Sequence, residues 1–279
     1  MNISKKYPNK RVVITGAGSG LGRTLALKFA RLGWKILISD LFIERAMETE
    51  EMVKEAGGQG LSVGCDVTKW EDVLNLAQTA EKEWGGADII INNAGVPGVG
   101  IMEDIPIEDW RWIIDINLMG VIYGCKAFLP MFKRQGSGHI VNTASAAGIV
   151  SLAEMGPYNV TKAGVISLSE TLRMELAGKK IGVTVVCPTF FKTNLMDQAR
   201  YTDEKQLARA QGFFKFALGT SNSVSRHIMR SIKKNRLYVV TQIDAKLYWK
   251  MKRYIPYIYF KLMGFVYSSG LLDKVLGVK

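Results

Sequence analysis

Short runs of apolar and β-branched residues alternate along the chain with longer stretches in which hydrophobic residues recur at helical spacing. Such runs are typical of buried strands, and the stretches between them are typical of helices. Right-handed strand–helix–strand units place helices on both faces of one twisted sheet. The pattern therefore predicts an α/β fold with a doubly wound parallel sheet, whose strands lie at residues 11–15, 35–39, 61–64, 88–92, 139–143, 182–187 and 236–240.

The chain has 279 residues, of which 48% are hydrophobic, so it can bury a large core. We expect residues 1–243 to fold as a single domain, because α/β domains often exceed the average domain size. Residues 244–279 follow the last expected strand and predict a basic, amphipathic helical extension. Pro256 should kink or split that extension, because proline cannot continue the helical hydrogen bonding.

A glycine-rich turn, "TGAGSGLG" at residues 15–22, follows the first expected strand. Glycine adopts positive φ and lets a ligand approach the main chain. The turn leads into a segment of helical period, and a helix N-terminus offers free N–H groups and the positive end of a dipole. The turn therefore predicts a site for the pyrophosphate of a dinucleotide, the alternative being a tight structural turn.

The second expected strand ends in Asp40, 20 residues after Gly20. An acidic residue at this spacing binds the adenosine ribose hydroxyls and repels a 2′-phosphate. No Arg or Lys occupies position 39 or 41, and we expect Arg45 to lie a turn too far along the next helix. The sequence therefore favours NAD over NADP, unless Asp40 serves only as a helix cap.

Tyr158 and Lys162 lie four residues apart in "PYNVTKAG", and a helix would place them on one face. A neighbouring ammonium favours the phenolate, so Lys162 is expected to lower the pKa of the Tyr158 phenol. The pair by itself is a common arrangement, and an exposed Tyr beside a solvated Lys is the alternative.

Residues 11–193 resemble the short-chain dehydrogenase/reductase superfamily, and the matching motifs occur in the same order. The glycine-rich turn matches the family's T-G-x-x-x-G-x-G, "CDV" at 65–67 its adenine contact, and "NNAG" at 92–95 its wall after the fourth strand. The resemblance implies one Rossmann-type domain. It also implies a cofactor-binding set of Gly16, Ser19, Gly20, Leu21, Gly22, Asp40, Asp66, Val67, Asn93, Ala94, Gly95, Tyr158, Lys162, Pro188 and Thr193.

The same resemblance implies four catalytic residues: Asn117, Ser145, Tyr158 and Lys162. In these roles Tyr158 exchanges a proton with the substrate oxygen, and Ser145 stabilises the charge that develops there. Lys162 lowers the phenol pKa and holds the nicotinamide ribose, while Asn117 positions a water for a proton relay. Thr189 departs from the family pattern, which often has Gly at this position.

These motifs predict an NAD-dependent oxidoreductase that interconverts an alcohol with its ketone or aldehyde. Substrate choice should lie in residues 96–100, 146–156 and 194–218, where Phe213, Phe214 and Phe216 would form an apolar lid or complete the core. A lid favours a lipophilic, steroid-, retinoid- or long-chain-like substrate. The alternatives are an NADPH-dependent reductase of carrier-bound 3-oxoacyl groups, which Asp40 disfavours, and a catalytically idle NAD-sensing protein.

The formal net charge is +12, and the excess is concentrated near the C-terminus. Residues 1–191 hold 20 Lys and Arg against 20 Asp and Glu, whereas residues 192–279 hold 17 against 5. Basic residues mixed with Trp and Tyr in 244–266 suit an anionic membrane surface; packing against the body or a sister subunit is the alternative. No base-stacking or groove-reading element indicates a nucleic-acid partner.

The start of the chain, "MNISKKYPNK", lacks the apolar core of a signal peptide, and no uninterrupted apolar run reaches the roughly 18 residues of a membrane span. Cys65, Cys125 and Cys187 show no metal-ligand spacing, so we expect reduced thiols and no metal. These features predict a cytoplasmic protein, peripheral at the inner face of a membrane if the extension binds lipid. The family resemblance implies a homodimer or homotetramer.

Overall fold

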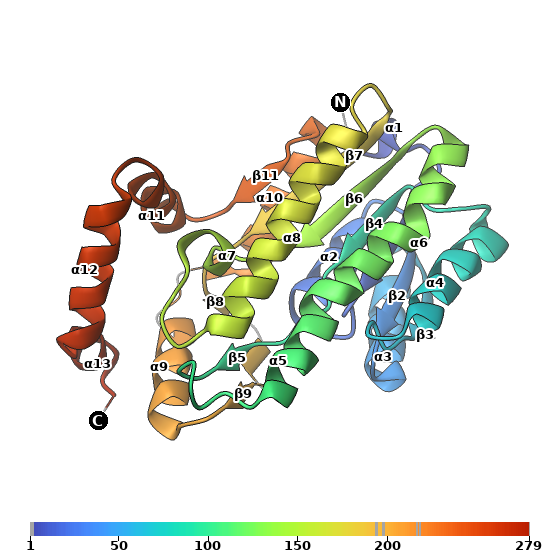
Figure 1. Ribbon diagram of the computed structural model, residues 1–279. Coiled ribbons are helices and arrows are strands. Elements are labelled where there is room, and N and C mark those ends of the chain that lie inside the picture. The colour runs from blue at the N-terminus through green and yellow to red at the C-terminus, as the bar shows by residue number, and fades with distance from the viewer. Residues whose placement is uncertain (1–2, 193–194, 197–198, 216, 218, 279) are drawn as a thin grey trace.

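Seven parallel strands form the central sheet of the protein, in the order β11–β7–β6–β4–β1–β2–β3 (Figure 1). The computed structural model describes residues 3–192, 195–196, 199–215, 217 and 219–278. The doubly wound α/β fold predicted from the sequence is confirmed. The strands are β1 Arg11–Thr15, β2 Lys35–Asp40, β3 Gln59–Gly64, β4 Ile89–Asn92, β6 Gly138–Thr143, β7 Ile181–Cys187 and β11 Tyr238–Val240.

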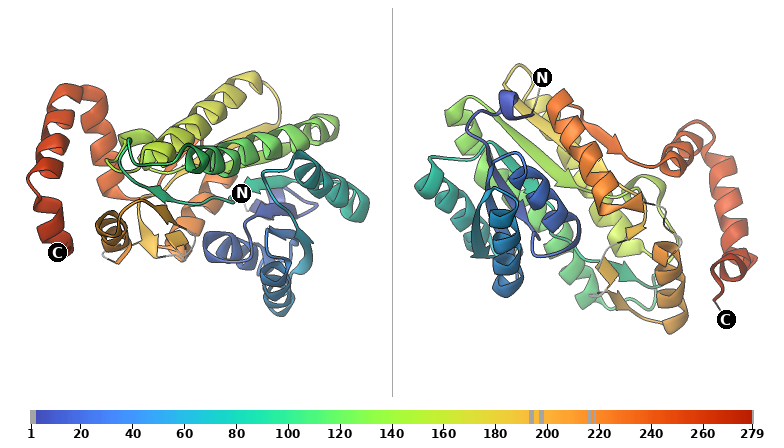
Figure 2. Two further views of the ribbon diagram at one scale, coloured as in Figure 1. Left: turned by 60° about the horizontal axis from the view of Figure 1, so that its bottom comes forward. Right: turned by 180° about the vertical axis from the view of Figure 1, so that it is seen from behind.

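Helices cover both faces of this sheet, as the two views of Figure 2 show. One face carries α2 Gly20–Ala30, α3 Ile43–Glu55 and α10 Ser221–Lys234. The other carries α4 Trp70–Trp84, α6 Gly120–Gln135 and α8 Gly156–Glu175. The shorter elements are α1 Ile3–Lys6, β5 Gly98–Val99, α5 Ile107–Ile114, the π-helix η1 Asp115–Met119, α7 Ala147–Val150, β8 Phe191–Lys192, β9 Arg200–Tyr201, α9 Glu204–Lys215 and β10 Gly219–Thr220.

Successive residues of each strand supply the two cores alternately. Val13 of β1 packs under α4, α6 and α8, whereas its neighbours Val12 and Ile14 pack under α2 and α10. A strand buried on both faces needs apolar residues at every position, because its side chains alternate between the faces. This requirement explains the uninterrupted apolar runs in the sequence.

A buried ion pair joins two neighbouring strands where they begin. The Arg11 guanidinium lies 3.1 Å from the Asp88 carboxylate, and the two side chains are 8% and 4% exposed. The Arg11 amide also donates to Asp88, at 2.9 Å, and its guanidinium donates to the Trp84 carbonyl and to Gln135. All of these groups hold the start of β1 in register with β4.

All three cysteines lie in the core under α4, α6 and α8. Burial raises the pKa of the Cys65, Cys125 and Cys187 thiols to about 12. They are free and buried. Each thiol is therefore protonated at neutral pH. Cys125 and Cys187 are shielded from solvent, whereas Cys65 lines the cleft at the carboxyl ends of the strands.

Among the described residues, one continuous helical segment is long and apolar enough to cross a membrane. It joins α5, η1 and α6 over Ile107–Gln135, with a mean hydropathy of 1.4 in its most apolar window. Its α6 part packs against α4 and against strands β4 and β6. A helix in the core of a domain passes the same test, and α6 packs as such a helix does.

The chain ends in three helices at one side of the domain: α11 Ile243–Tyr254, α12 Pro256–Ser268 and α13 Leu271–Leu276 (Figures 1 and 2). Pro256 is the first residue of α12, so it separates two helices as expected from its missing N–H. The division of the chain into a domain at 1–243 and an extension at 244–279 stays a prediction.

Candidate active site

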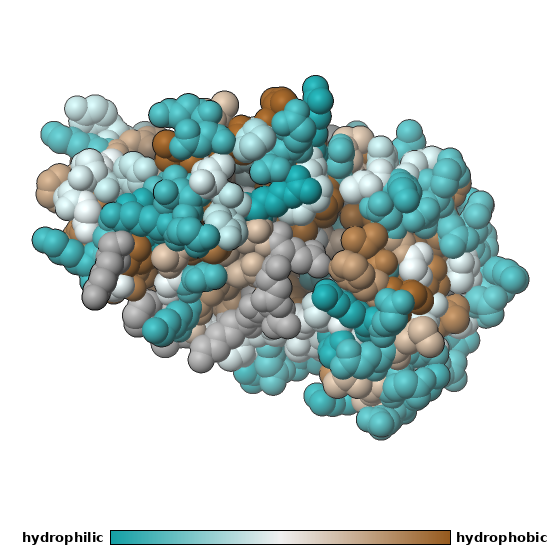
Figure 3. All heavy atoms as spheres, turned by 90° about the horizontal axis from the view of Figure 1, so that it is seen from below, coloured by the Kyte–Doolittle hydropathy of each residue, from teal (hydrophilic) through white to brown (hydrophobic). Residues whose placement is uncertain are grey.

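A cleft of about 440 Å³ lies at the carboxyl ends of the strands. This edge of the sheet faces the lower side of Figure 1, and Figure 3 views the molecule from there, with hydrophobic side chains near the middle and hydrophilic ones around them. Loops after β1, β2, β3, β4, β6 and β7 line the cleft. Of the residues expected from the sequence, those in its wall are Gly16, Ser19, Gly20, Leu21, Asp40, Asp66, Val67, Asn93, Ala94, Gly95, Tyr158, Lys162 and Pro188.

Three of the described site residues are placed differently. Gly22 packs against the turn, and Ser145 and Asn117 lie outside the cleft wall, with Asn117 fully buried. Thr193 lies outside the described residues. The structure thus brings most of the expected residues to one cleft and puts three others around it.

The glycine-rich turn needs its glycines for close packing as well as for access to the main chain. Gly16 has φ +61°, and a Cβ atom there would lie 2.8 Å from the Cα of Ala94. At Gly22 a Cβ would lie 2.2 Å from the Gly16 carbonyl oxygen. Both positions therefore exclude any larger residue.

The first turn of α2 is suited to a phosphate group. Ser19, its N-cap residue, makes no side-chain cap hydrogen bond, and the first turn carries no acidic residue. Helix N-termini hold phosphates through main-chain N–H groups and the helix dipole. The turn, the helix end and the cleft beside them fit a dinucleotide pyrophosphate.

Asp40 ends β2 with its carboxylate beside the glycine-rich turn. Its two oxygens accept hydrogen bonds from the amides of Gly18, at 2.9 Å, and Phe42, at 3.2 Å. Arg45 also lines the cleft, with its guanidinium carbon 4.6 Å from the Phe42 ring centroid. The expectation that Arg45 lies too far along the helix to reach the cleft is wrong. The first turn of α3 packs over Gly18, so closely that a Cβ atom added to Gly18 would lie 2.6 Å from the Cβ of Arg45.

The loop after β4 packs directly against the glycine-rich turn. The Asn93 side chain donates to the carbonyls of Thr15 and Gly16, at 3.0 and 3.1 Å. The Thr15 hydroxyl accepts from the amides of Asn93 and Ala94. Thr15 thus connects the end of β1 to the loop after β4. The sequence indicated Thr15 only as the first residue of the glycine-rich motif, because its hydrogen-bond partners lie far away in the chain.

Tyr158 and Lys162 stand one turn apart near the start of α8, on the face that the helix buries. Tyr158 is 8% exposed and Lys162 is 3% exposed. The Lys162 ammonium donates to the Thr143 carbonyl at 3.1 Å and lies 5.5 Å from the Tyr158 ring centroid. Thr143 was missed by sequence reasoning because a backbone carbonyl carries no residue signal.

Burial dominates the titration of both groups. It raises the pKa of Tyr158 above its ordinary value, and the Ser145 hydroxyl acts in the opposite direction. It lowers the pKa of Lys162 to about 8, against an opposing effect of Cys187. The expected lowering of the phenol pKa by Lys162 is therefore not seen, since desolvation of the phenolate outweighs the distant ammonium. At pH 7 the phenol is neutral and the ammonium is charged.

Asn117 lies in the π-helix η1, between α5 and α6. Its side-chain oxygen accepts from the Val96 amide and its nitrogen donates to the Val96 carbonyl, both at 2.8 Å. The side chain is fully buried. These bonds fix the wall of the cleft at Val96; the role of Asn117 in a proton relay stays a prediction.

The expected aromatic lid is only partly described. Phe213 of α9 stacks on Phe190 with ring centroids 4.9 Å apart, and Phe214 meets the same ring edge-on at 5.1 Å. Phe216 lies outside the described residues. Phe191 and Leu195 line the cleft beside this cluster. The rings of Phe190, Phe213 and Phe214 are not part of the cleft wall, and Phe191, which follows Phe190 in the chain, is.

A family model described as "short chain dehydrogenase" matches residues 10–204. The chain is 35% identical to cyclohexanol dehydrogenase of an Acinetobacter species over 70% of its length and 78% of that protein. It is 33% identical over 88% of its length to the probable oxidoreductase EphD of Mycobacterium tuberculosis, of which it covers 43%. A short-chain dehydrogenase/reductase of Burkholderia phymatum, solved with NAD, superposes with a TM-score of 0.82 at 33% identity, covering 87% of this chain and 92% of that one.

Proposed function

Since the chain belongs to the short-chain dehydrogenase family, which makes it an oxidoreductase with a nicotinamide cofactor, we propose that it interconverts a lipophilic alcohol and its ketone or aldehyde using NAD. The observation that carries this proposal is the placement of Tyr158 one helical turn from Lys162 in a cleft that also contains the Asp40 carboxylate.

The cofactor would supply the hydride and accept it in reverse, and the protein supplies binding, orientation and a proton. In the reductive direction the neutral Tyr158 phenol donates its proton to a carbonyl oxygen and becomes a phenolate. In the oxidative direction the phenolate takes the proton from the alcohol and becomes the phenol again. Ser145 donates a hydrogen bond to the same oxygen, and Lys162 binds the ribose next to the nicotinamide. We place the adenosine ribose at Asp40 and the phosphates at the start of α2.

The preference for NAD should depend on the charge of Asp40. Asp40→Asn keeps an oxygen to accept from Gly18 but removes the charge, so we expect the ratio of kcat/KM with NAD to kcat/KM with NADP to fall about tenfold. Glu44→Gln, an exposed change on α3 outside the cleft wall, is the control and should leave the ratio unchanged. An unchanged ratio in Asp40→Asn would refute the proposed NAD preference.

Cofactor affinity should fall with rising pH because Lys162, whose pKa burial lowers to about 8, loses its charge above that pH. We expect the dissociation constant of NADH, followed by fluorescence, to increase about tenfold between roughly pH 7 and 9.5, since each unit above the pKa costs up to a factor of ten. Lys162→Met should bind NADH more weakly and show a flat profile. A profile of the same slope in both proteins would contradict this assignment.

Two observations support the proposed lipophilic substrate class: the apolar cluster around Phe190, and the similarity of the chain to a protein named cyclohexanol dehydrogenase. A screen of straight-chain and cyclic alcohols, monitored by NADH absorbance, tests it. We expect kcat/KM to increase about fourfold with each added methylene until the pocket is filled. A preference for small polar alcohols would exclude the lipophilic class. The proposed homodimer or homotetramer is a separate question that light scattering answers.

A further inference from the structure

The C-terminal helix α12 is apolar on all sides and yet exposed. Of its 13 residues only Lys261 is charged and only Tyr259 is buried. Helices that are hydrophobic all round are normally found inside a protein core or in a membrane. The exposed large hydrophobic side chains of α11 to α13 are Ile243, Leu247, Tyr248, Tyr254, Ile255, Tyr257, Ile258, Phe260, Leu262, Phe265, Tyr267, Leu271 and Val275.

Polar contacts hold the inner side of this extension to the domain. The Tyr259 hydroxyl donates to the Val150 carbonyl at 2.8 Å, and the Lys252 ammonium donates to the Ile149 carbonyl at 2.7 Å. The extension is therefore a docked part of the molecule, and the direction in which its outer side faces is fixed.

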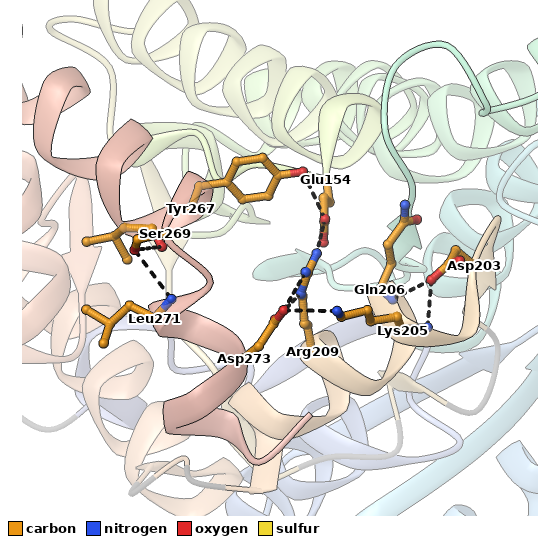
Figure 4. A network of polar contacts seen from close by, with 10 residues as sticks. Glu154, Asp203, Lys205, Gln206, Arg209, Tyr267, Ser269, Leu271 and Asp273 are labelled. Carbon is orange, nitrogen blue, oxygen red and sulfur yellow. Dashed lines mark hydrogen bonds and ion pairs between the residues drawn. The ribbon is translucent and has the colours of Figure 1, made fainter. Parts of the chain in front are cut away.

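An ion-pair network anchors its far end (Figure 4). Asp273 of α13 accepts from Arg209 of α9 at 2.9 Å and pairs with Lys205 at 3.3 Å. Arg209 also pairs with Glu154, which in turn accepts from the Tyr267 hydroxyl at 3.0 Å. Because Glu154 belongs to the loop between α7 and α8, the extension is tied to that loop.

The charges left on the extension are mostly positive, with the exposed Asp244 as the exception. Residues 243–279 contain seven Lys and Arg and two Asp and Glu, and Asp273 is already paired. Lys246, Lys250 and Arg253 of α11 are exposed, whereas Lys252 faces the domain. Trp249, which the sequence suggested as an interfacial group, instead packs on Tyr238 with ring centroids 5.1 Å apart.

We propose that the outer side of α11 and α12 binds the surface of an anionic lipid membrane. Exposed aliphatic side chains and tyrosines enter the boundary between headgroups and acyl chains, while Lys246, Lys250 and Arg253 contact lipid phosphates. With 13 residues α12 is about 20 Å long, too short to cross the hydrocarbon layer, so it lies in the plane of the surface.

A second copy of the chain fits this surface less well. A twofold interface pairs the same patch on both subunits, so it would bring the exposed lysines and Arg253 of two copies towards each other. Like charges at an interface oppose association, whereas anionic headgroups complement them. The positive charge of the extension thus favours an anionic membrane over a second copy of the chain.

Vesicle co-sedimentation of the full chain tests the proposal without any need for turnover. We expect it to bind vesicles of phosphatidylcholine mixed with phosphatidylserine and to bind pure phosphatidylcholine weakly. Ile258→Asp with Phe265→Asp, which lie seven residues apart on one helix face, should weaken binding about tenfold or more. Lys250→Glu with Arg253→Glu should weaken it to a similar extent and remove most of the salt dependence.

Matched controls place the same changes elsewhere on the surface. Met102→Asp with Met174→Asp replaces hydrophobic residues that are 71% and 70% exposed, and Lys233→Glu with Lys234→Glu reverses two charges of α10. Both control proteins should bind as the unchanged chain does. No binding to anionic vesicles, equal loss in the controls, or a change of oligomeric state in the Ile258 and Phe265 variant without vesicle binding would each overturn the proposal.

Discussion

Tyr158→Phe should lower turnover about a thousandfold and leave the affinity for NADH within about twofold. A positioned proton donor contributes roughly 10² to 10⁴ in rate, and phenylalanine keeps the ring but removes the only proton it can give. The ring is buried against the other residues of the cleft wall, so the substitution preserves packing. Binding of the dinucleotide rests on main-chain groups and on Asp40, which remain in place.

The measurement is kcat for the best alcohol in the substrate screen, beside the dissociation constant of NADH. Tyr123→Phe is the matched control, because that residue lies on α6 outside the cleft wall and packs edge-on against Trp70. It should retain the turnover of the unchanged protein. Turnover in Tyr158→Phe within a factor of ten of the control would assign the proton transfer to another group.

Asp88→Ala should reduce the free energy of unfolding by about 3 to 5 kcal/mol. The substitution leaves the Arg11 guanidinium, 8% exposed, without its carboxylate and takes the acceptor from the Arg11 amide. A buried charge without its partner is costly because its desolvation is no longer offset by the ion pair. The start of β1 should loosen, and β1 is the strand that presents the glycine-rich turn.

Urea unfolding followed by circular dichroism measures this loss. Glu81→Ala breaks the exposed Glu81–Arg134 pair and should cost no more than about 1 kcal/mol. The double variant Arg11→Met with Asp88→Leu removes both charges and should recover most of the stability. Equal costs for Asp88→Ala and Glu81→Ala would show that the buried pair has no special weight.

The seven long strands were predictable because burial on both faces demands continuous apolar runs. The errors fall where this demand weakens. The edge strand β3 begins at Gln59 rather than at residue 61, since Gln59 and Gly60 pair with Lys35 and Ile36 through the main chain. The two-residue strands β5, β8, β9 and β10 leave no hydrophobic pattern, and their pairing partners lie far away in the chain.

The cofactor side of the cleft was predictable because its residues follow strands in short motifs. The placement of Arg45 was not, because it depends on how α3 packs over Gly18. The sequence also does not reveal that the Asn117 side chain hydrogen-bonds to the main chain of Val96, or that burial is the largest effect on the Tyr158 pKa. These features arise from three-dimensional packing between segments distant in the chain.

The positions of the cysteines allow thiol labelling to detect opening of one of the two cores. Cys65, Cys125 and Cys187 all occupy the layer beneath α4, α6 and α8, and the opposite core holds no cysteine among the described residues. Cys125 and Cys187, protonated and enclosed, escape alkylation and oxidation while that layer stays closed, whereas Cys65 lines the cleft and is left out of the measurement. The rate of thiol labelling therefore measures how fast those three helices detach from the sheet. Fraying of α2 or α10, which cover the other core, does not change that rate.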